Sequence, residues 1–327
     1  MKILVAVYSQ FASWCIPDEQ VARLRREFPE HTFVRATSDA EALERIVEAD
    51  VAVAARLTPS HLAASRRLKW IHSPAAGVGN MLFPEMLASP VVLSNSRGNS
   101  SGTIAEHVIA VTLALLRDLP LAWRRQAARV WAQDEFNAGA SIRSLADARV
   151  LVVGLGSIGG RVAHLASAFG AHVVGVRRRV DGDRRPGIAA VVPPSRLHDE
   201  LPHADVVVIA APQTSETVHL MGERELALMK RDAVLVNVSR GKLIDEPALV
   251  RALESGRLRG AALDVFEHEP LSPDSPLWSR EDVLITPHVS GFHARYWDDA
   301  TTLFAGNLRR FVAGEPLVNP VDKTAGY

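Results

Sequence analysis

The amino-acid sequence predicts an α/β protein with two parallel-sheet domains. Short apolar runs alternate with segments of helical spacing along nearly the whole chain, which is typical of parallel sheets covered by helices. Two of the runs, 205–210 (DVVVIA) and 233–238 (AVLVNV), are almost continuously apolar, as expected for strands buried on both faces. With 327 residues, the chain is long enough to form two hydrophobic cores.

Residues 1–99 are expected to form a small parallel sheet with its helices. Five apolar runs are the predicted strands: 3–7, 32–35, 51–54, 68–71 and 91–93. Helices are predicted at 18–28, from Ser38 (with Glu41 in the capping-box position) and at 59–64. The small-residue loop 73–79 follows a strand, where open α/β sheets bind ligands, although a plain turn explains its composition equally well.

A polar stretch at 94–102 is rich in Gly, Ser and Asn and predicts a hinge. A long helix follows, with Ile104, Val108, Val111 and Leu115 on one stripe. Glu106 and His107 near its start are expected to pack rather than to catalyse. Residues 121–148 are expected to cover the second sheet before its first strand.

Residues 149–179 have the pattern strand, glycine turn, helix, strand. The apolar run 150–153 leads into Gly154, Gly156 and Gly159, a GxGxxG turn, and Gly170 ends the helix that follows. In such a turn the first glycine permits the bend, the second lets a pyrophosphate approach the backbone, and the third lets the helix pack closely. The pattern predicts a dinucleotide-binding βαβ unit of Rossmann type. A purely structural glycine turn is the alternative.

The residues after the second strand of this unit bear on the choice of cofactor. An acidic residue there would bind the ribose hydroxyls of NAD, but the chain has Arg177, Arg178 and Arg179. Guanidinium groups suit a 2′-phosphate, so we predict NADP, with NAD as the alternative cofactor. The competing interpretation is a solvated basic loop that Asp181 and Asp183 neutralise.

The alternation of strands and helices continues to the end of the chain. Strands are predicted at 189–192, 205–210, 233–238, 261–265 and 283–286, and helices at 195–201, from Asp245 to Gly256 and at 294–313. Three polar residues follow the last three of these strands: Arg240, Glu269 and His288. Because the carboxyl ends of parallel strands meet at one edge of a sheet, we expect the three to face one crevice.

This trio suits hydride transfer to a 2-oxo acid. Arg240 can bind the substrate carboxylate, and His288 can donate a proton to the carbonyl oxygen. Glu269 can orient the imidazole and favour its charged form. Each residue also has a structural interpretation, as a surface ion pair, a loop acid or a satisfied histidine. His268 is expected to face away from the crevice.

Composition excludes several other classes of protein. The formal net charge is zero, so neither nucleic acid nor an anionic membrane is expected as the main partner. Cys15 is the only cysteine, the histidines show no metal-ligand spacing, and no metal is predicted. No apolar run reaches the length of a membrane span and the start lacks a signal-peptide pattern, so a cytoplasmic protein is expected.

Taken in order, these motifs resemble the D-isomer-specific 2-hydroxyacid dehydrogenase family. The resemblance rests on segments spread over the chain: Ala76-Gly77-Val78, Ala105-Glu106-His107, Gly154–Gly159, Asn237–Gly241, Asp264–Phe266 with Glu269-Pro270, and Thr286-Pro287-His288. It implies a Rossmann nucleotide domain (100–291) inserted in a flavodoxin-like substrate domain (1–99 and 292–327), and usually a homodimer.

The resemblance also implies roles for single residues. Arg240, Glu269 and His288 are the expected catalytic residues, and Ala76 and Gly77 would offer backbone N–H groups to the substrate carboxylate. Thr103 and Ser157 would touch cofactor phosphates, and Asp264 would hold the nicotinamide carboxamide. The remaining expected cofactor contacts, besides the glycines and arginines named above, are Ile158, Ala211, Pro212, Thr217, Val238, Ser239 and Gly291.

Within this family the chain is most like the glyoxylate/hydroxypyruvate reductases, and the expected ligand is a small 2-oxo or 2-hydroxy acid. Many members have an acidic residue where Arg177 stands, which is why NADP is preferred here. Two alternatives remain open. The first is a biosynthetic, phosphoglycerate-like dehydrogenase using NAD, in which Arg56 could serve a phosphate. The second is a non-enzymatic, nicotinamide-sensing corepressor or scaffold.

Overall fold

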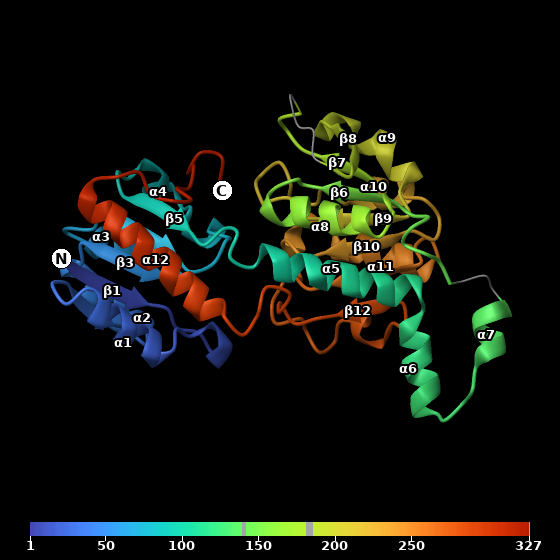
Figure 1. Ribbon diagram of the computed structural model, residues 1–327, viewed down its shortest axis with the longest axis horizontal. Coiled ribbons are helices and arrows are strands. Elements are labelled where there is room, and N and C mark those ends of the chain that lie inside the picture. Colours follow the sequence, from blue (N-terminus) through green and yellow to red (C-terminus); the bar gives the residue numbers. More distant parts are fainter. Residues whose placement is uncertain (139–141, 181–185, 327) are drawn as a thin grey trace. The chain divides into compact units, whose positions relative to one another are not determined.

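The computed structural model describes residues 1–138, 142–180 and 186–326. The chain divides into two compact units (Figure 1). The first unit contains residues 1–99 and 293–327, and the second contains residues 100–292. The second unit is therefore an insertion in the sequence of the first.

The first unit is built on a five-stranded parallel sheet with the order β2-β1-β3-β4-β5. Its strands are β1 (Lys2–Ala6), β2 (Thr32–Arg35), β3 (Val51–Ala54), β4 (Trp70–Ser73) and β5 (Val92–Asn95). All neighbouring pairs are parallel. This is the flavodoxin-like order, in which the direction of winding reverses between β1 and β3.

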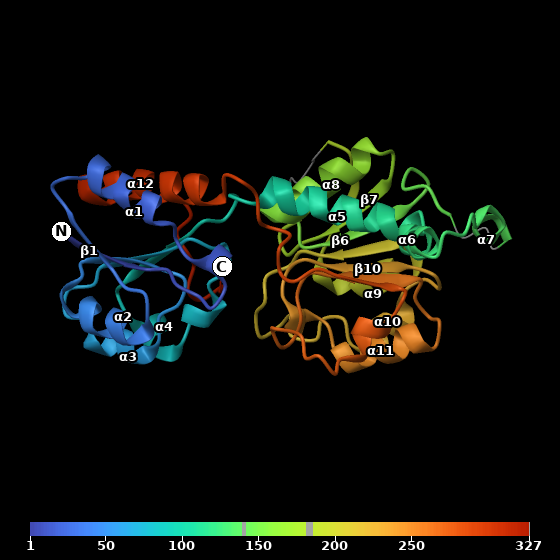
Figure 2. The same ribbon diagram turned by 90° about the horizontal axis from the view of Figure 1, so that it is seen from below.

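Helices cover both faces of this sheet (Figure 2). On one face lie α1 (Asp18–Glu27) and α12 (Tyr296–Ala313), and on the other lie α2 (Asp39–Arg45), α3 (Pro59–Ala64) and α4 (Pro84–Ala88). The buried ring of Trp70 on β4 stacks on Phe304 of α12, with 5.4 Å between ring centroids. This apolar contact joins the C-terminal helix to the N-terminal sheet.

The second unit is built on a seven-stranded parallel sheet with the order β12-β11-β10-β9-β6-β7-β8. Its strands are β6 (Arg149–Val153), β7 (His172–Val176), β8 (Ile188–Val192), β9 (Val206–Ile209), β10 (Val234–Asn237), β11 (Gly260–Leu263) and β12 (Val283–Ile285). The order reverses at β6, which pairs with β7 on one side and β9 on the other. This is the Rossmann arrangement, and the predicted fold class is confirmed in both units.

Helices also cover both faces of the second sheet. On one face lie α5 (Ser101–Leu116) and α8 (Ser157–Ala168), and on the other lie α9 (Leu197–Glu200), α10 (Glu223–Leu228) and α11 (Glu246–Glu254) (Figure 2). The helices α6 (Leu119–Ala127) and α7 (Gln133–Ala138) instead lead away from the sheet (Figure 1). Trp131, between them, is 90% exposed, so the prediction that residues 121–148 cover the sheet is wrong for the part from α6 to α7. Leu145 and Ala148, by contrast, are buried in the core of the second unit.

Among the helices of the described ranges, none has the length and hydropathy that a membrane span requires. Over the same residues, no group of three or more His, Cys, Asp or Glu side chains is arranged to hold a metal ion.

Candidate active site

The glycine turn between β6 and α8 is closely packed on one side and open on the other. Gly154 has a φ of +101°, and a Cβ there would lie 2.5 Å from the backbone nitrogen of Ala211. A Cβ on Gly159 would lie 1.9 Å from the carbonyl oxygen of Gly154. By contrast, a Cβ on Gly156 would meet no heavy atom within 4 Å. The open side, at the N-terminus of α8, therefore has room for the phosphates of a dinucleotide.

A pair of alanine substitutions separates packing from binding in this turn. Gly159→Ala is expected to destabilise the fold by about 3 kcal/mol or more, because the new Cβ collides with backbone rather than with a flexible side chain. Gly156→Ala has open space and an ordinary φ of −78°, so it is expected to keep the stability of the wild type and to weaken NADPH binding. Thermal unfolding and NADPH titration of both variants check this. Loss of stability in Gly156→Ala would contradict it.

The arginines predicted to select the cofactor follow β7 in the same unit. The backbone N–H of Arg177 donates to the carbonyl oxygen of Val192 (3.0 Å), which places Arg177 at the carboxyl end of the sheet. Arg178 lies 4.0 Å from Glu216, while Arg179 is exposed. Asp181 and Asp183, which the competing interpretation needs, lie outside the described residues. The choice of NADP over NAD remains a prediction from these arginines.

The other expected cofactor contacts also lie in the second unit. Two of them fix the segment after β9: the hydroxyl of Ser239 donates to the carbonyl oxygen of Ala211, and that of Thr217 donates to the carbonyl oxygen of Pro212 (2.8 Å). The rest occupy α5, α8, the end of β10 and the loop between β12 and α12: Thr103, Ser157, Ile158, Val238 and Gly291. Their contacts with a cofactor remain predictions.

Asp264, directly after β11, organises the loop that carries His288. Its side chain is buried, with an exposed fraction of 1% for the residue. Its Oδ1 accepts hydrogen bonds from the hydroxyl of Thr286 (2.6 Å) and the N–H of Val289 (2.9 Å), and its Oδ2 accepts from the N–H of Ser290 (3.0 Å). The backbone N–H of His288 donates to the Asp264 carbonyl oxygen (2.8 Å). Asp264 thus has a positioning role that the sequence did not suggest.

His107 on α5 reaches this network. Its Nε2 lies 3.3 Å from the hydroxyl oxygen of Thr286. Burial lowers the pKa of His107, although the Asp264 carboxylate acts in the opposite direction. The contact with the Asp264 network agrees with the expectation that His107 packs rather than catalyses.

Arg240, Glu269 and His288 line a single pocket of about 250 Å³. They follow β10, β11 and β12, so their grouping results from the shared carboxyl edge of neighbouring strands. Nδ1 of His288 lies 2.7 Å from Oε2 of Glu269, and Oε1 of Glu269 accepts a hydrogen bond from the N–H of Phe266 (3.0 Å). Since the carboxylate accepts, Nδ1 carries the proton and the reactive atom of the imidazole is Nε2.

The charge states of the pocket follow from burial and neighbours. Burial alone would raise the pKa of Glu269, but hydrogen bonds from His288 and Phe266 and the charge of Arg240 outweigh it and bring the pKa below its usual value. Burial lowers the pKa of Arg240, while the negative charge of Glu269 acts in the opposite direction. The guanidinium group remains charged at neutral pH. Nη1 of Arg240 donates to the carbonyl oxygen of Ser239 (2.6 Å), which uses one of its five N–H donors.

The backbone of His288 is in the left-handed region, with a φ of +54°. A non-glycine residue there is strained and persists where its surroundings hold it, most often at a functional site. The hydrogen bond to Asp264 and a second one from the His288 N–H to the carbonyl oxygen of Thr286 (3.0 Å) supply that support.

The pocket also contains residues for which no role was predicted from the sequence. These are Gln213, Gly241, Lys242, Phe266 and Glu267. Each stands within two or three residues of a predicted site residue at a strand end, which was the available signal. His268 is exposed and is not among the lining residues.

The expected substrate residues Ala76 and Gly77 lie in the first unit, in the loop after β4. The side-chain amide of Asn95 donates to the carbonyl oxygen of Ala76 (2.7 Å), and the N–H of Ser96 donates to that of Ala75 (3.1 Å). The loop is thereby held from the end of β5. Its contact with a substrate remains a prediction.

Comparison with known proteins places these features in a family. A sequence model described as "D-isomer specific 2-hydroxyacid dehydrogenase, NAD binding domain" matches residues 109–290. A glyoxylate reductase of Korarchaeum cryptofilum is 32% identical over 287 residues, which are 86% of this chain and 85% of that protein. A D-3-phosphoglycerate dehydrogenase of Methanocaldococcus jannaschii is 30% identical over 309 residues, 93% of this chain. The chain spans only 57% of the length of that protein, and 49% of its Mycobacterium leprae counterpart.

Solved structures of similar fold cover nearly the full length of this chain. A D-isomer specific 2-hydroxyacid dehydrogenase from Xanthobacter autotrophicus, in complex with NADPH and MES, is 30% identical, with a TM-score of 0.85 and 99% of both chains covered. An NADPH-dependent glyoxylate/hydroxypyruvate reductase from Sinorhizobium meliloti, in complex with NADP and sulfate, is 27% identical. It has a TM-score of 0.85, with 100% of this chain and 99% of that chain covered.

Proposed function

This chain belongs to the D-isomer-specific 2-hydroxyacid dehydrogenase family, and we propose that it reduces small 2-oxo acids with NADPH, as a glyoxylate or hydroxypyruvate reductase does. The observation that carries the proposal is the pocket in which Arg240 lies with the hydrogen-bonded pair Glu269 and His288. Similarity to reductases that use these substrates supports the choice of acid.

The proposed chemistry assigns one task to each residue. Arg240 binds the substrate carboxylate through parallel N–H donors and orients the ketone. Glu269 accepts a hydrogen bond from Nδ1 of His288 and fixes the orientation of the ring, with Nε2 toward the substrate. Nε2 of His288 then donates its proton to the ketone oxygen, and the same atom accepts it in the reverse reaction. The nicotinamide, when bound, supplies the hydride to the ketone carbon.

We propose NADPH rather than NADH because of Arg177 and its neighbours. Arg177→Asp is expected to lower the ratio of kcat/KM with NADPH to kcat/KM with NADH at least about tenfold, because a carboxylate repels the 2′-phosphate and accepts from a ribose hydroxyl. Arg231→Asp, on the exposed turn before β10, makes the same change in net charge and is the matched control. A wild-type enzyme that uses NADH equally well, or an unchanged ratio in Arg177→Asp, would contradict the cofactor assignment.

The similarity to D-3-phosphoglycerate dehydrogenases supports a second candidate function, oxidation of a phosphorylated D-hydroxy acid with NAD. Turnover of glyoxylate, hydroxypyruvate, pyruvate, phenylpyruvate, 2-oxoglutarate and 3-phosphohydroxypyruvate, each with NADPH and with NADH, separates the two. The proposed function predicts the highest kcat/KM for glyoxylate or hydroxypyruvate with NADPH. The family resemblance also supports a homodimer, which light scattering of the purified protein tests.

A further inference from the structure

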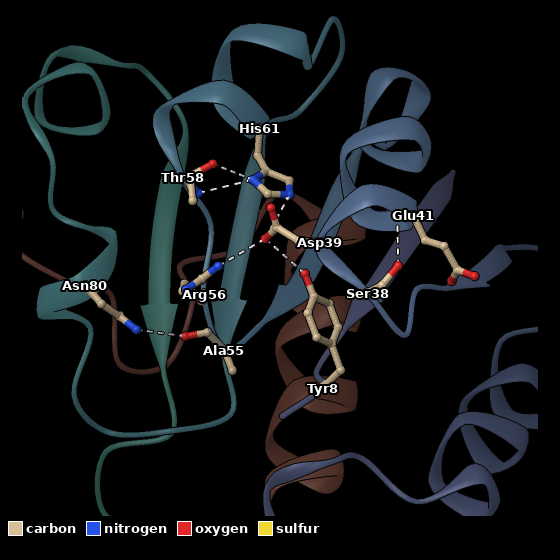
Figure 3. Close-up of polar contacts among 9 residues, drawn as sticks. All are labelled: Tyr8, Ser38, Asp39, Glu41, Ala55, Arg56, Thr58, His61 and Asn80. Atoms are coloured by element: carbon tan, nitrogen blue, oxygen red, sulfur yellow. Dashed lines mark hydrogen bonds and ion pairs between the residues drawn. The ribbon is translucent and has the colours of Figure 1, made fainter. Parts of the chain in front are cut away.

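Three hydrogen-bond donors of the first unit converge on one carboxylate (Figure 3). Oδ1 of Asp39 lies 3.4 Å from the hydroxyl of Tyr8, 3.3 Å from Nη2 of Arg56 and 3.9 Å from Nε2 of His61. Burial, and then the Asp39 carboxylate, raises the pKa of Tyr8, so its hydroxyl remains a donor at neutral pH. A set of neutral and cationic donors around one oxygen is the environment of a bound anion.

His61 supplies an independent sign that this is a binding position. The residue is 1% exposed, and its Nδ1 accepts from the backbone N–H of Thr58 (3.3 Å). The ring proton is therefore on Nε2, which points toward Asp39 (Figure 3). Nε2 of His61 is buried and has no hydrogen-bond partner within the described ranges, because Asp39, at 3.9 Å, is too distant. A buried donor without an acceptor is costly, and an anion placed between the three donors would satisfy it.

The cluster lies where open α/β sheets bind ligands. Tyr8 follows β1 and Arg56 follows β3, the two strands between which the winding of the five-stranded sheet reverses. The side-chain amide of Asn80 donates to the carbonyl oxygen of Ala55 (3.4 Å). This bond links the Arg56 segment to the loop that contains Ala76 and Gly77, the residues expected to receive the substrate carboxylate.

We propose that Tyr8, Arg56 and His61 form an anion subsite which Asp39 occupies, so that the enzyme discriminates against 2-oxo acids with a second anionic group. The proposal rests on the proposed function, because it specifies the class of acid. Without Asp39, the subsite presents a guanidinium and two neutral donors to a distal phosphoryl or carboxylate group. With Asp39, the guanidinium is paired and the added carboxylate repels such a group.

Substitution of Asp39 tests the proposal through matched substrates. The readout is the ratio of kcat/KM for 3-phosphohydroxypyruvate to that for hydroxypyruvate, with oxaloacetate and pyruvate as the carboxylate pair. Because Asp39 and Arg56 are 54% and 63% exposed at their side chains, screening by water limits the effect, and Asp39→Asn is expected to raise the ratios about tenfold. Asp39→Glu keeps the charge and is expected to leave them low. The double variant Asp39→Asn/Arg56→Gln is expected to lose the gain.

Absence of turnover with every acid would count against the proposed function alone. A binding measurement still decides the proposal in that case. Inorganic phosphate is titrated into NADPH-saturated protein by calorimetry, while NMR follows the His61 Nε2 resonance. Asp39→Asn is expected to bind phosphate more tightly than the wild type and the double variant, with a shift of that resonance. If Asp39→Asn unfolds at a lower temperature than the wild type, Asp39→Ser replaces it in the same titration. Equal phosphate binding by all variants, or a gain that survives Arg56→Gln, would overturn the proposal.

Discussion

Replacement of His288 by alanine is expected to lower kcat about 10²- to 10⁴-fold, the usual contribution of a general acid, without changing the affinity for NADPH. The imidazole is the proposed proton donor, and its Nδ1 lies 2.7 Å from Oε2 of Glu269 in the pocket. Steady-state kinetics with hydroxypyruvate and titration with NADPH measure the two quantities separately.

His268→Ala is the matched control for this variant. His268 precedes Glu269 in the chain but is exposed and is not among the residues that line the pocket. We expect kcat of His268→Ala to stay within about twofold of the wild type, as for surface changes in general. Near-normal turnover by His288→Ala, or equal losses in the two variants, would show that the proton comes from another group.

Arg240→Ala is expected to lower kcat/KM about 10²- to 10⁴-fold, because it removes two charge-assisted hydrogen bonds to the substrate carboxylate. We expect KM for the 2-oxo acid to rise and kcat to fall, since the ketone is no longer oriented. Arg240→Lys keeps the charge without the planar fork and is expected to recover only part of the loss. Initial rates at varied acid concentration measure this. A KM unchanged in Arg240→Ala would exclude substrate binding by Arg240.

Most of the fold could be predicted from local sequence. The runs at 150–153 and 172–176 flank a glycine turn and a helical stripe, and the structure has β6, α8 and β7 there. The grouping of Arg240, Glu269 and His288 also followed from local signals, because parallel strands place their carboxyl ends at one edge. The composition of 94–102 predicted a hinge where the first unit limit lies, whereas the second limit came from the family resemblance.

The features that could not be predicted depend on contacts between distant residues. The left-handed backbone of His288 is supported by a hydrogen bond to Asp264, 24 residues earlier, and no local pattern marks it. Asp39 and Arg56 are 17 residues apart, and their side chains meet only in the folded unit. The capping box at Ser38 differs for a local reason. The hydroxyl of Ser38 accepts from the Glu41 N–H as the capping box requires, but the Glu41 carboxylate accepts from the N–H of Thr37 rather than from that of Ser38.

The central claim is that this chain transfers a hydride from NADPH to a small 2-oxo acid and protonates the resulting oxygen. The most direct test follows NADPH absorbance with hydroxypyruvate and quantifies glycerate by chiral chromatography in the same reaction. The account predicts equimolar NADPH oxidation and D-glycerate formation, both lost in His288→Ala. NADPH that binds but is not oxidised with any of the six acids of the panel would contradict the claim, as would formation of the L isomer.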